Sequence, residues 1–279
     1  MLELSVLVDN NTIIDQYFKG EPGLSYYIKE EDTHILFDLG YSNIFIDNAN
    51  QMGLDLNDVD YLVFSHGHID HTGGLDPLIK HYFETKKETD KGYPEIIAHP
   101  DCFRDKYYGN NTSIGVNVTK QVINQLFKVT ESKKPIWITE KLVYLGEIER
   151  TNDFEAKKSI GYQDKIAKGY EDYIMDDTAL AYLSEDGVVI ITGCSHAGIC
   201  NIVEKAKKVT GIDNVVDIIG GFHLMEPGQK QLIKTKEYIK KLRLEQLHAC
   251  HCTDLNSKVH LAEVSDLKEV GVGLRLEYK

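Results

Sequence analysis

The 279-residue sequence has no long hydrophobic run, few cysteines and no excess of positive charge. No segment approaches the roughly 20 apolar residues that a membrane-spanning helix needs, so no membrane partner is expected. The first residues, MLELSVLVDNNTIIDQYFKG, lack the basic flank and cleavage site of a signal peptide and resemble a β-strand. Five cysteines, an odd number, do not suggest a disulfide framework and indicate reduced thiols in a cytoplasmic protein.

Acidic residues outnumber basic ones by 44 to 31, which gives a formal net charge of −13. This charge repels polyanions, so extended nucleic acid is not expected as a partner, whereas a small-molecule substrate is compatible with it. The sequence shows no internal repeat, no low-complexity tract and no sharp linker. We therefore expect a single domain over residues 1–279, with an insertion at about 84–175 that covers the active site; the oligomeric state stays open.

Short apolar runs alternate with amphipathic segments along the chain. Runs with the composition of strands lie at 4–10, 33–40, 60–66, 95–100, 141–147, 179–193, 214–223, 245–251 and 271–278. Helical patterns lie at 41–52, 74–83, 198–209, 228–242 and 256–269, the last with Asn256 as its expected cap. Within 181–192 the turn Ser184-Glu185-Asp186-Gly187 predicts a hairpin. Interleaved strands and helices indicate an α/β or layered α+β fold.

The stretch FSHGHIDHTGGL, residues 64–75, crowds His66, His68, Asp70 and His71 directly behind the apolar run VDYLVF. His66 and His68 are two apart in extended backbone, so they project to the same side and can bind one metal ion. Asp70 and His71, past a bend, can turn toward a second ion. Imidazoles with one carboxylate suit zinc, iron or manganese rather than calcium. A merely solvated cluster of histidines is the weaker interpretation, because four such residues rarely gather at a strand end for solubility alone.

This motif resembles the mark of the metallo-β-lactamase superfamily, His-x-His-x-Asp-His after a strand, which residues 66–71 match without a gap. The sequence ILFDLG at 35–40 resembles the early Asp-x-Gly element of that superfamily. With GCSHAGICNI at 193–202, GGFHL at 220–224 and HCT at 251–253, the chain is similar to one subgroup. That subgroup resembles the 7,8-dihydropterin-6-methyl-4-(β-D-ribofuranosyl)aminobenzene-5′-phosphate synthases.

The resemblance implies an αββα sandwich, in which two β-sheets are flanked by helices and a dinuclear metal site lies at one edge. Two divalent transition-metal ions are implied, zinc by preference, with manganese or iron as alternatives. Each ion is expected to have three protein ligands, namely His66, His68 and His196 for one and Asp70, His71 and His251 for the other.

One departure leaves the bridging ligand open. Where the superfamily often has Thr-Gly-Asp, with the aspartate between the metals, this chain has Thr192-Gly193-Cys194. Three residues are candidates for the missing ligand: Cys194 as a thiolate, His196, or Asp177 before the strand at 179. An acidic pair such as Asp176-Asp177 is more often part of a turn, so Asp177 ranks below the other two.

Four further positions have weaker signals. Asp38 is expected to hydrogen-bond to a ligand histidine and orient it, although a turn aspartate before Gly40 is an equal alternative. His223 ends a strand behind two glycines, where it can bind substrate or donate a proton. Cys250 and Cys252 flank His251, and strand alternation would point both away from it, which favours core packing.

Two adjacent cations can lower the pKa of a shared water toward about 7 and polarise a phosphoryl or carbonyl oxygen. The sequence therefore predicts a hydrolase of phosphate esters or phosphodiesters, with Asp70 and His223 as catalytic groups. The alternative is a transferase that joins a dihydropterin to a ribosyl-aminobenzene phosphate and releases pyrophosphate. A purely structural metal module is disfavoured, because structural zinc sites usually close with four ligands. A diiron flavoprotein is disfavoured because resemblance to that class requires Glu at position 68, where this chain has His68.

Overall fold

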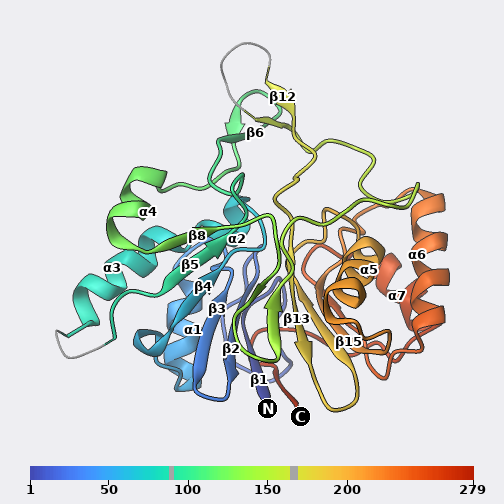
Figure 1. Cartoon of the computed structure of the whole chain (residues 1–279), viewed down its shortest axis with the longest axis horizontal. Coiled ribbons are helices and arrows are strands. Elements are labelled where there is room, and N and C mark those ends of the chain that lie inside the picture. The colour runs from blue at the N-terminus through green and yellow to red at the C-terminus, as the bar shows by residue number, and fades with distance from the viewer. Residues whose placement is uncertain (88–90, 164–168) are drawn as a thin grey trace.

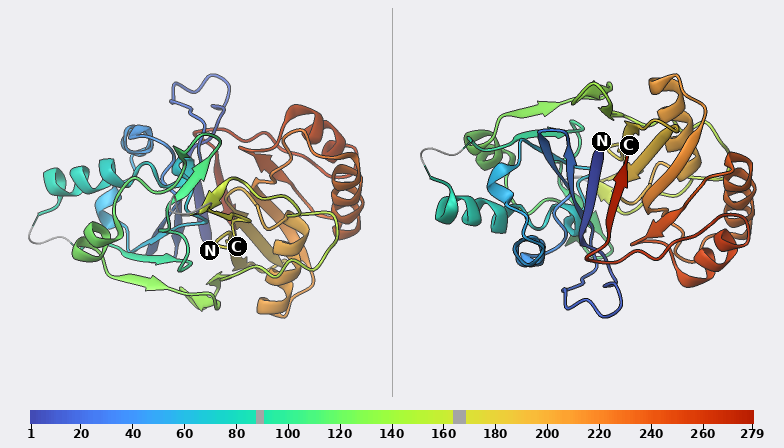
Figure 2. Two further views of the ribbon diagram at one scale, coloured as in Figure 1. Left: turned by 90° about the horizontal axis from the view of Figure 1, so that it is seen from above. Right: turned by 90° about the horizontal axis from the view of Figure 1, so that it is seen from below.

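The protein was studied as a computed structural model that describes residues 1–87, 91–163 and 169–279. Two β-sheets pack face to face in the centre, and helices cover the outer face of each sheet (Figures 1 and 2). The expected αββα sandwich is therefore confirmed. Among the described residues, no helix combines the length and the apolar character needed to cross a bilayer.

The first sheet has the strand order β17-β1-β2-β3-β4-β5-β8. Its strands are β1 (Leu2–Val8), β2 (Ser25–Glu30), β3 (Thr33–Phe37), β4 (Tyr61–Val63), β5 (Glu95–Ala98), β8 (Val129–Glu131) and β17 (Arg275–Tyr278). Pairing is antiparallel from β17 to β3 and parallel from β3 to β8. The outer face is covered by the helices α1 (Ile44–Met52), α3 (Leu75–Thr85) and α4 (Lys120–Leu126), while η1 (Leu56–Asp58) and α2 (Ile69–Thr72) are single turns.

The second sheet has the order β16-β15-β14-β13-β10-β9. Its strands are β9 (Ile136–Trp137), β10 (Leu142–Tyr144), β13 (Ala179–Leu183), β14 (Val188–Thr192), β15 (Val215–Gly221) and β16 (His248–Cys250). Strands β14, β15 and β16 run parallel, so their carboxyl ends meet at one edge of the sheet. The covering helices are α5 (Ile199–Thr210), α6 (Gln229–Leu242) and α7 (Leu255–Ala262).

Strand β14 shows how the sequence builds the sandwich. Val189 and Ile191 point into the core between the two sheets, whereas Val188 and Ile190 point toward the layer that holds α5. Because both faces of the strand are buried, its sequence is a continuous apolar run rather than an alternating one. Burial of each such side chain contributes roughly 1.5–3 kcal/mol, so the sandwich has a strong hydrophobic driving force.

The region 84–175 contributes to all parts of the fold. It supplies β5, β8 and α4 to the first layer pair and β9 and β10 to the second sheet. It also forms a small sheet with the order β12-β11-β6-β7, made of β6 (Lys106–Tyr108), β7 (Thr112–Ser113), β11 (Tyr162–Gln163) and β12 (Tyr170–Glu171). This small sheet stands beyond the edge of the sandwich at which α2 lies (Figure 1). Residues 88–90 and 164–168 of the region lie outside the described residues.

Most elements expected from the sequence are present, including the β13–β14 hairpin, in which Ser184 N donates to Gly187 O. The prediction for the last helix was wrong at both ends. Helix α7 begins at Leu255 behind Asp254, whose carboxylate accepts a hydrogen bond from Ser257 N, and it ends at Ala262. A capping side chain must precede the first turn, as Asp254 does, whereas the expected cap Asn256 lies inside that turn.

Candidate metal centre

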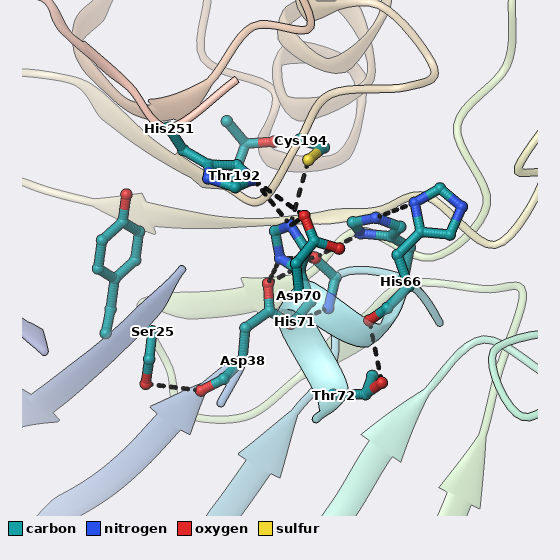
Figure 3. A network of polar contacts seen from close by, with 12 residues as sticks. Ser25, Asp38, His66, Asp70, His71, Thr72, Thr192, Cys194 and His251 are labelled. Carbon is teal, nitrogen blue, oxygen red and sulfur yellow. Dashed lines mark hydrogen bonds and ion pairs between the residues drawn. The ribbon is translucent and has the colours of Figure 1, made fainter. Parts of the chain in front are cut away.

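The residues with metal-binding side chains all follow the carboxyl ends of strands, at the rim where the two sheets meet. The loop from His66 to His71 follows β4 and passes into α2. Cys194 and His196 follow β14, and His251 follows β16. Figure 3 shows His66, Asp70, His71, Cys194 and His251 converging between the layers, so the arrangement of the strands explains why residues far apart in the chain meet here.

The first group contains His66, His68 and His196, and all three rings are buried. His66 Nε2 lies 3.0 Å from His68 Nδ1 and 3.2 Å from His196 Nε2. With metal–nitrogen bonds of about 2.0–2.1 Å, two ligands of a tetrahedral ion stand roughly 3.3–3.4 Å apart, so the spacing fits one ion. Burial lowers the pKa of His66 and His196 well below its ordinary value and that of His68 to about 4. The rings are thus neutral near pH 7, as metal binding requires.

The second group contains Asp70, His71, Cys194 and His251. His71 Nε2 lies 3.1 Å from Cys194 Sγ and 3.2 Å from His251 Nε2, and Asp70 Oδ2 lies 3.4 Å from His251 Nε2. Burial opposes ionisation of Asp70, but His71 and His251 beside it outweigh burial and lower its pKa. A thiol, a carboxylate and two imidazoles form a donor set that suits zinc or iron better than magnesium or calcium.

The two groups are adjacent. The His66 and His71 rings, one from each group, have centroids 4.3 Å apart. Since the loop 66–71 supplies donors to both groups, the arrangement can hold a pair of ions at close range, which is the geometry of two-metal hydrolytic sites.

Asp38 contacts both groups, directly or through Ser65. Its Oδ2 lies 2.7 Å from His71 Nδ1 and accepts a 2.6 Å hydrogen bond from Ser65 Oγ, which lies 2.9 Å from His66 Nδ1. Hydrogen bonds at the far nitrogen fix the orientation of an imidazole, so one buried carboxylate positions rings in both groups. Gly193 is needed here, because a Cβ atom at that position would lie 2.1 Å from Ser65 Oγ. Asp38 itself has a left-handed backbone, φ 57°.

His71 could bind a metal through Nε2 while it donates to Asp38 through Nδ1, but it must first lose a proton. Burial lowers its pKa, but the charges of Asp70 and Asp38 outweigh burial and raise the pKa to about 9. In the metal-free protein the ring is therefore protonated near neutral pH. Metal binding must displace this proton, which makes metal affinity fall as the pH falls.

His251 is fixed by two residues that sequence reasoning did not single out. Its backbone N–H donates to Asp9 Oδ1 at 2.9 Å, and its Nδ1 lies 2.9 Å from Asn10 Oδ1. Asp9 and Asn10 directly follow β1, so their position at a strand end is the sequence feature that could have indicated a role at this site. The pairing of β1 with β2 in the first sheet brings them to the same rim as Asp70.

Lys106 of the small sheet is also connected to the metal-binding loop, although its side chain is fully buried. Its Nζ lies 2.8 Å from Asp176 Oδ1 and 3.2 Å from Asp172 Oδ2. Asp176 Oδ2 in turn accepts a 2.8 Å hydrogen bond from Gly67 N, between His66 and His68. These contacts attach part of the region 84–175 to the backbone of the loop.

Two sequence candidates occupy positions beside the two groups. Asp177 is in neither group; its Oδ2 accepts from Ala197 N at 2.9 Å, and burial raises its pKa to about 7. The His223 ring lies beside that of His196, tilted by 53° with centroids 4.4 Å apart, and borders a cavity of about 370 Å³.

Both Cys250 and Cys252 are buried, as expected for core packing, but their surroundings differ. Cys250 is in the core and contacts the Tyr26 hydroxyl at 3.2 Å. Cys252 Sγ instead lies 3.3 Å from the Cys194 carbonyl and accepts a hydrogen bond from His223 N. Strand β16 ends at Cys250, and His251 has a left-handed backbone, φ 46°, so strand alternation does not extend to Cys252.

The fold is that of one family. Residues 19–207 match the family model of the metallo-beta-lactamase superfamily, and the chain belongs to that superfamily, as the motif at 66–71 predicted. Among curated proteins, the chain is 30% identical over 270 residues to the 7,8-dihydropterin-6-methyl-4-(beta-D-ribofuranosyl)-aminobenzene-5′-phosphate synthase of Methanocaldococcus jannaschii, a match that covers 92% of this chain and 89% of that protein. It is also 30% identical over 273 residues to an uncharacterized protein of the same organism, with 97% and 98% of the two chains covered.

Solved structures agree on the fold. A metal-dependent hydrolase of the beta-lactamase superfamily superposes with a TM-score of 0.82 over 99% of both chains, at 24% identity. A diphosphatase from the PhnP family gives a TM-score of 0.57 at 16% identity, with 100% of this chain and 98% of that one covered.

Proposed function

We propose that the protein is a hydrolase that uses two divalent transition-metal ions, preferably zinc, to cleave a phosphate ester or phosphodiester. The observation that supports this most is the adjacency of the two donor groups, His66 with His68 and His196, and Asp70 with His71, Cys194 and His251. When bound, such a pair of ions lowers the pKa of a water molecule toward about 7 and polarises a phosphoryl oxygen. Positive charge at the rim also offsets the repulsion of an anionic substrate by a chain of net charge −13.

The residues around the donor groups have separate roles in this proposal. Asp38 keeps His71 in one orientation, and Asp70, ionised and partly accessible, orients the attacking water or accepts its proton. His223 borders the cavity and protonates the leaving oxygen. Burial opposes protonation of His223, but the Cys252 sulfur beside it outweighs burial and raises the pKa of the imidazole. A histidine whose pKa is raised in this way is suited to act as a general acid.

The test compares leaving groups in His223→Ala. Loss of a general acid should slow a phosphodiester with an alkyl leaving group by about 100-fold or more, while a p-nitrophenyl ester, which leaves without a proton, should be slowed far less. His223→Gln, which keeps a hydrogen-bond donor but transfers no proton, should behave like His223→Ala. Metal content should match that of the parent protein, because His223 is in neither donor group.

Equal slowing of both esters would leave His223 with a positioning role only. A metal-loaded protein inert toward every phosphate ester would rule out the hydrolase.

A transferase is the second candidate, and the relative named as a synthase is the observation that favours it. Both candidates need an anionic leaving group to be stabilised at the same rim, so the donor groups suit either. The deciding assay supplies a dihydropterin that carries a pyrophosphate ester as its leaving group together with a ribofuranosyl-aminobenzene phosphate, and measures coupled product and the released pyrophosphate. Product that forms only with both substrates present, without ester hydrolysis, would establish the transferase.

A further inference from the structure

A cavity of about 370 Å³ opens beside the metal centre, on the side of His196 and His223. Its walls come from the segment 153–160, from Tyr173, and from the segment 225–231 that leads into α6. Neither segment contributes to the two donor groups. A substrate whose reacting phosphate sits at the donor groups therefore has room to extend over His223 into this cavity.

The cavity wall has more positive than negative charge, in contrast to the chain as a whole. Lys157, Lys158 and Lys230 line it, together with the carboxylates of Asp153 and Glu226. Lys230 Nζ is paired with Asp153 Oδ2 at 2.7 Å, so that lysine is largely neutralised. Within the described residues, Lys157 and Lys158 are exposed and form no ion pair. These two ammonium groups are available to an anion, because Asp153 is held by Lys230, which is the main cause of the lowered pKa of that carboxyl, with Lys157 contributing less.

Apolar side chains form the rest of the wall. Phe154 and Tyr173 supply aromatic rings to the lining, which also includes Pro227 and Met225, a side chain that is 56% exposed. Exposed apolar side chains gathered at a cavity beside a reactive centre are typical of a binding surface rather than of ordinary solvent-facing surface. The cavity thus combines a surface for a ring with two unpaired cations.

We infer that this cavity is a substrate subsite for organic phosphates that carry a ring and a second anionic group beyond the reacting one. The inference rests on the proposed phosphoester hydrolysis. The ring lies against Phe154, Tyr173 and Met225, and the second anion, a phosphate or a carboxylate, is bound by Lys157 and Lys158. Charge-assisted hydrogen bonds to two ammonium groups provide the preference for a doubly anionic substrate.

The test uses two substrates with the same reacting diester and the same leaving group. One is thymidine 5′-(p-nitrophenyl phosphate), and the other is the same molecule with a phosphate on its 3′ oxygen. The metal-loaded full-length protein should favour the 3′-phosphorylated compound by about tenfold in kcat/KM, the difference expected from one or two charge-assisted contacts. In Lys157→Gln/Lys158→Gln this ratio should fall to near one.

Lys240→Gln/Lys241→Gln is the matched control, because it removes the same charge from exposed lysines at the end of α6, outside the cavity lining. It should keep the parent ratio, and a ratio lost equally in both variants would indicate bulk electrostatics rather than a subsite. A parent ratio near one, or a ratio unchanged in Lys157→Gln/Lys158→Gln, would overturn the inference.

A binding measurement separates this inference from the proposed hydrolysis. Calorimetric titration of the metal-loaded protein should show tighter binding of thymidine 3′,5′-bisphosphate than of thymidine 5′-monophosphate by about tenfold, and Lys157→Gln/Lys158→Gln should remove the difference. If neither ester is turned over but the binding difference follows the two lysines, the hydrolase proposal fails and the subsite stands. Equal affinities in the parent protein would refute the subsite whatever the reaction.

Discussion

At the scale of single residues, protons and metal ions compete for the same nitrogen atoms. The first group is ready for a cation, because burial keeps His66, His68 and His196 neutral. The second group differs, since Asp38 and Asp70 hold a proton on His71. The zinc affinities of the two groups should therefore depend differently on pH, and the second group should lose its ion first as the pH is lowered.

A comparison of His196→Ala with Asp177→Ala tests which of these two residues is the metal ligand. His196 Nε2 lies 3.2 Å from His66 Nε2. Asp177 belongs to neither donor group, and its carboxylate accepts a hydrogen bond from Ala197 N. We expect His196→Ala to lose about one ion per chain in elemental analysis, while Asp177→Ala keeps its metal content. The reverse order would make Asp177 the true ligand.

The thiol of Cys194 gives a spectroscopic prediction. Cys194 Sγ lies 3.1 Å from His71 Nε2, within the second group. If Cys194 binds as a thiolate, cobalt-substituted protein should show a strong sulfur-to-metal charge-transfer absorption that Cys194→Ser abolishes. Cys252→Ser is the control and should retain the band, because Cys252 Sγ contacts the Cys194 carbonyl rather than the donor group. An identical spectrum in Cys194→Ser would exclude the thiolate ligand.

The sequence predicted the donor residues from their places at strand ends, which is a local property. It did not predict Ser65, Asp9 or Asn10 as orienting groups, because their partners are chosen by the packing of one sheet on the other. Asp38 was expected to hydrogen-bond to a histidine of the 66–71 loop because such imidazoles need their far nitrogen fixed, and it does so, but its choice of His71 over His66 depends on ring geometry that no spacing encodes.

At the scale of elements, helix α5 depends on a residue far away in the chain for its first turn. Gly198, with φ 95°, precedes the helix, and no side chain of the helix's own segment caps it. Instead Glu155, only 1% exposed, accepts from Cys200 N and Asn201 N. The carboxylate satisfies amide groups that the helix leaves without partners and lies at the positive end of the helix dipole.

Burial raises the pKa of Glu155 above its ordinary value despite these hydrogen bonds. The folded state then binds the proton more tightly than the unfolded state, in which the pKa is about 4.3. The contribution of this group to the free energy of unfolding is complete below that pH and is lost as the pH rises through the folded-state pKa. Glu155→Gln has no such titration, so its stability relative to the parent should improve as the pH rises from about 4 toward neutrality.

Urea denaturation at several pH values measures this difference. Glu237→Gln, at an exposed position on α6, is the control and should run parallel to the parent protein. A difference between Glu155→Gln and the parent that is independent of pH would contradict the assignment.

Element prediction succeeded where an apolar run was clear and failed where it was weak or very short. Strand β14 is a continuous apolar run of five residues, and β15 is largely apolar around Asp217; both were expected. Strand β2, with the more polar sequence SYYIKE, was not expected. Strands β11 and β12 have two residues each, and α4 has only seven within a polar region. Such pieces are stabilised by their neighbours rather than by their own pattern, so periodicity has too few positions to reveal them.

At the scale of the whole molecule, bound metal would join the two halves of the sandwich. The loop 66–71 belongs to the first sheet, and Cys194, His196 and His251 belong to the second. An ion bound to either group therefore stabilises the contact between the sheets, and its binding free energy adds to the free energy of unfolding. The fold itself does not depend on the ion, because the core between the sheets is extensive.

Removal of metal should lower the melting temperature measurably. Free metal at a thousand times its Kd contributes about 4 kcal/mol, which corresponds to a shift on the order of 10 °C for a chain of this size. Calorimetry before and after chelation, with elemental analysis of about two ions per chain beforehand, measures it. Re-addition of zinc should restore the transition, and a chelator should have a smaller effect on His196→Ala. No metal in the purified protein and no effect of chelator would refute the dinuclear site.

The pairing of β1 with β17 places the two ends of the chain side by side, with Leu2 opposite Tyr278. The first sheet is therefore incomplete while the chain is being synthesised, and the loop 66–71 emerges long before Cys194 and His251. Such long-range pairing makes folding slow, because distant segments must meet before their contacts stabilise anything. During biosynthesis the first donor group can therefore be complete only after His196 has been made, and the second only after His251.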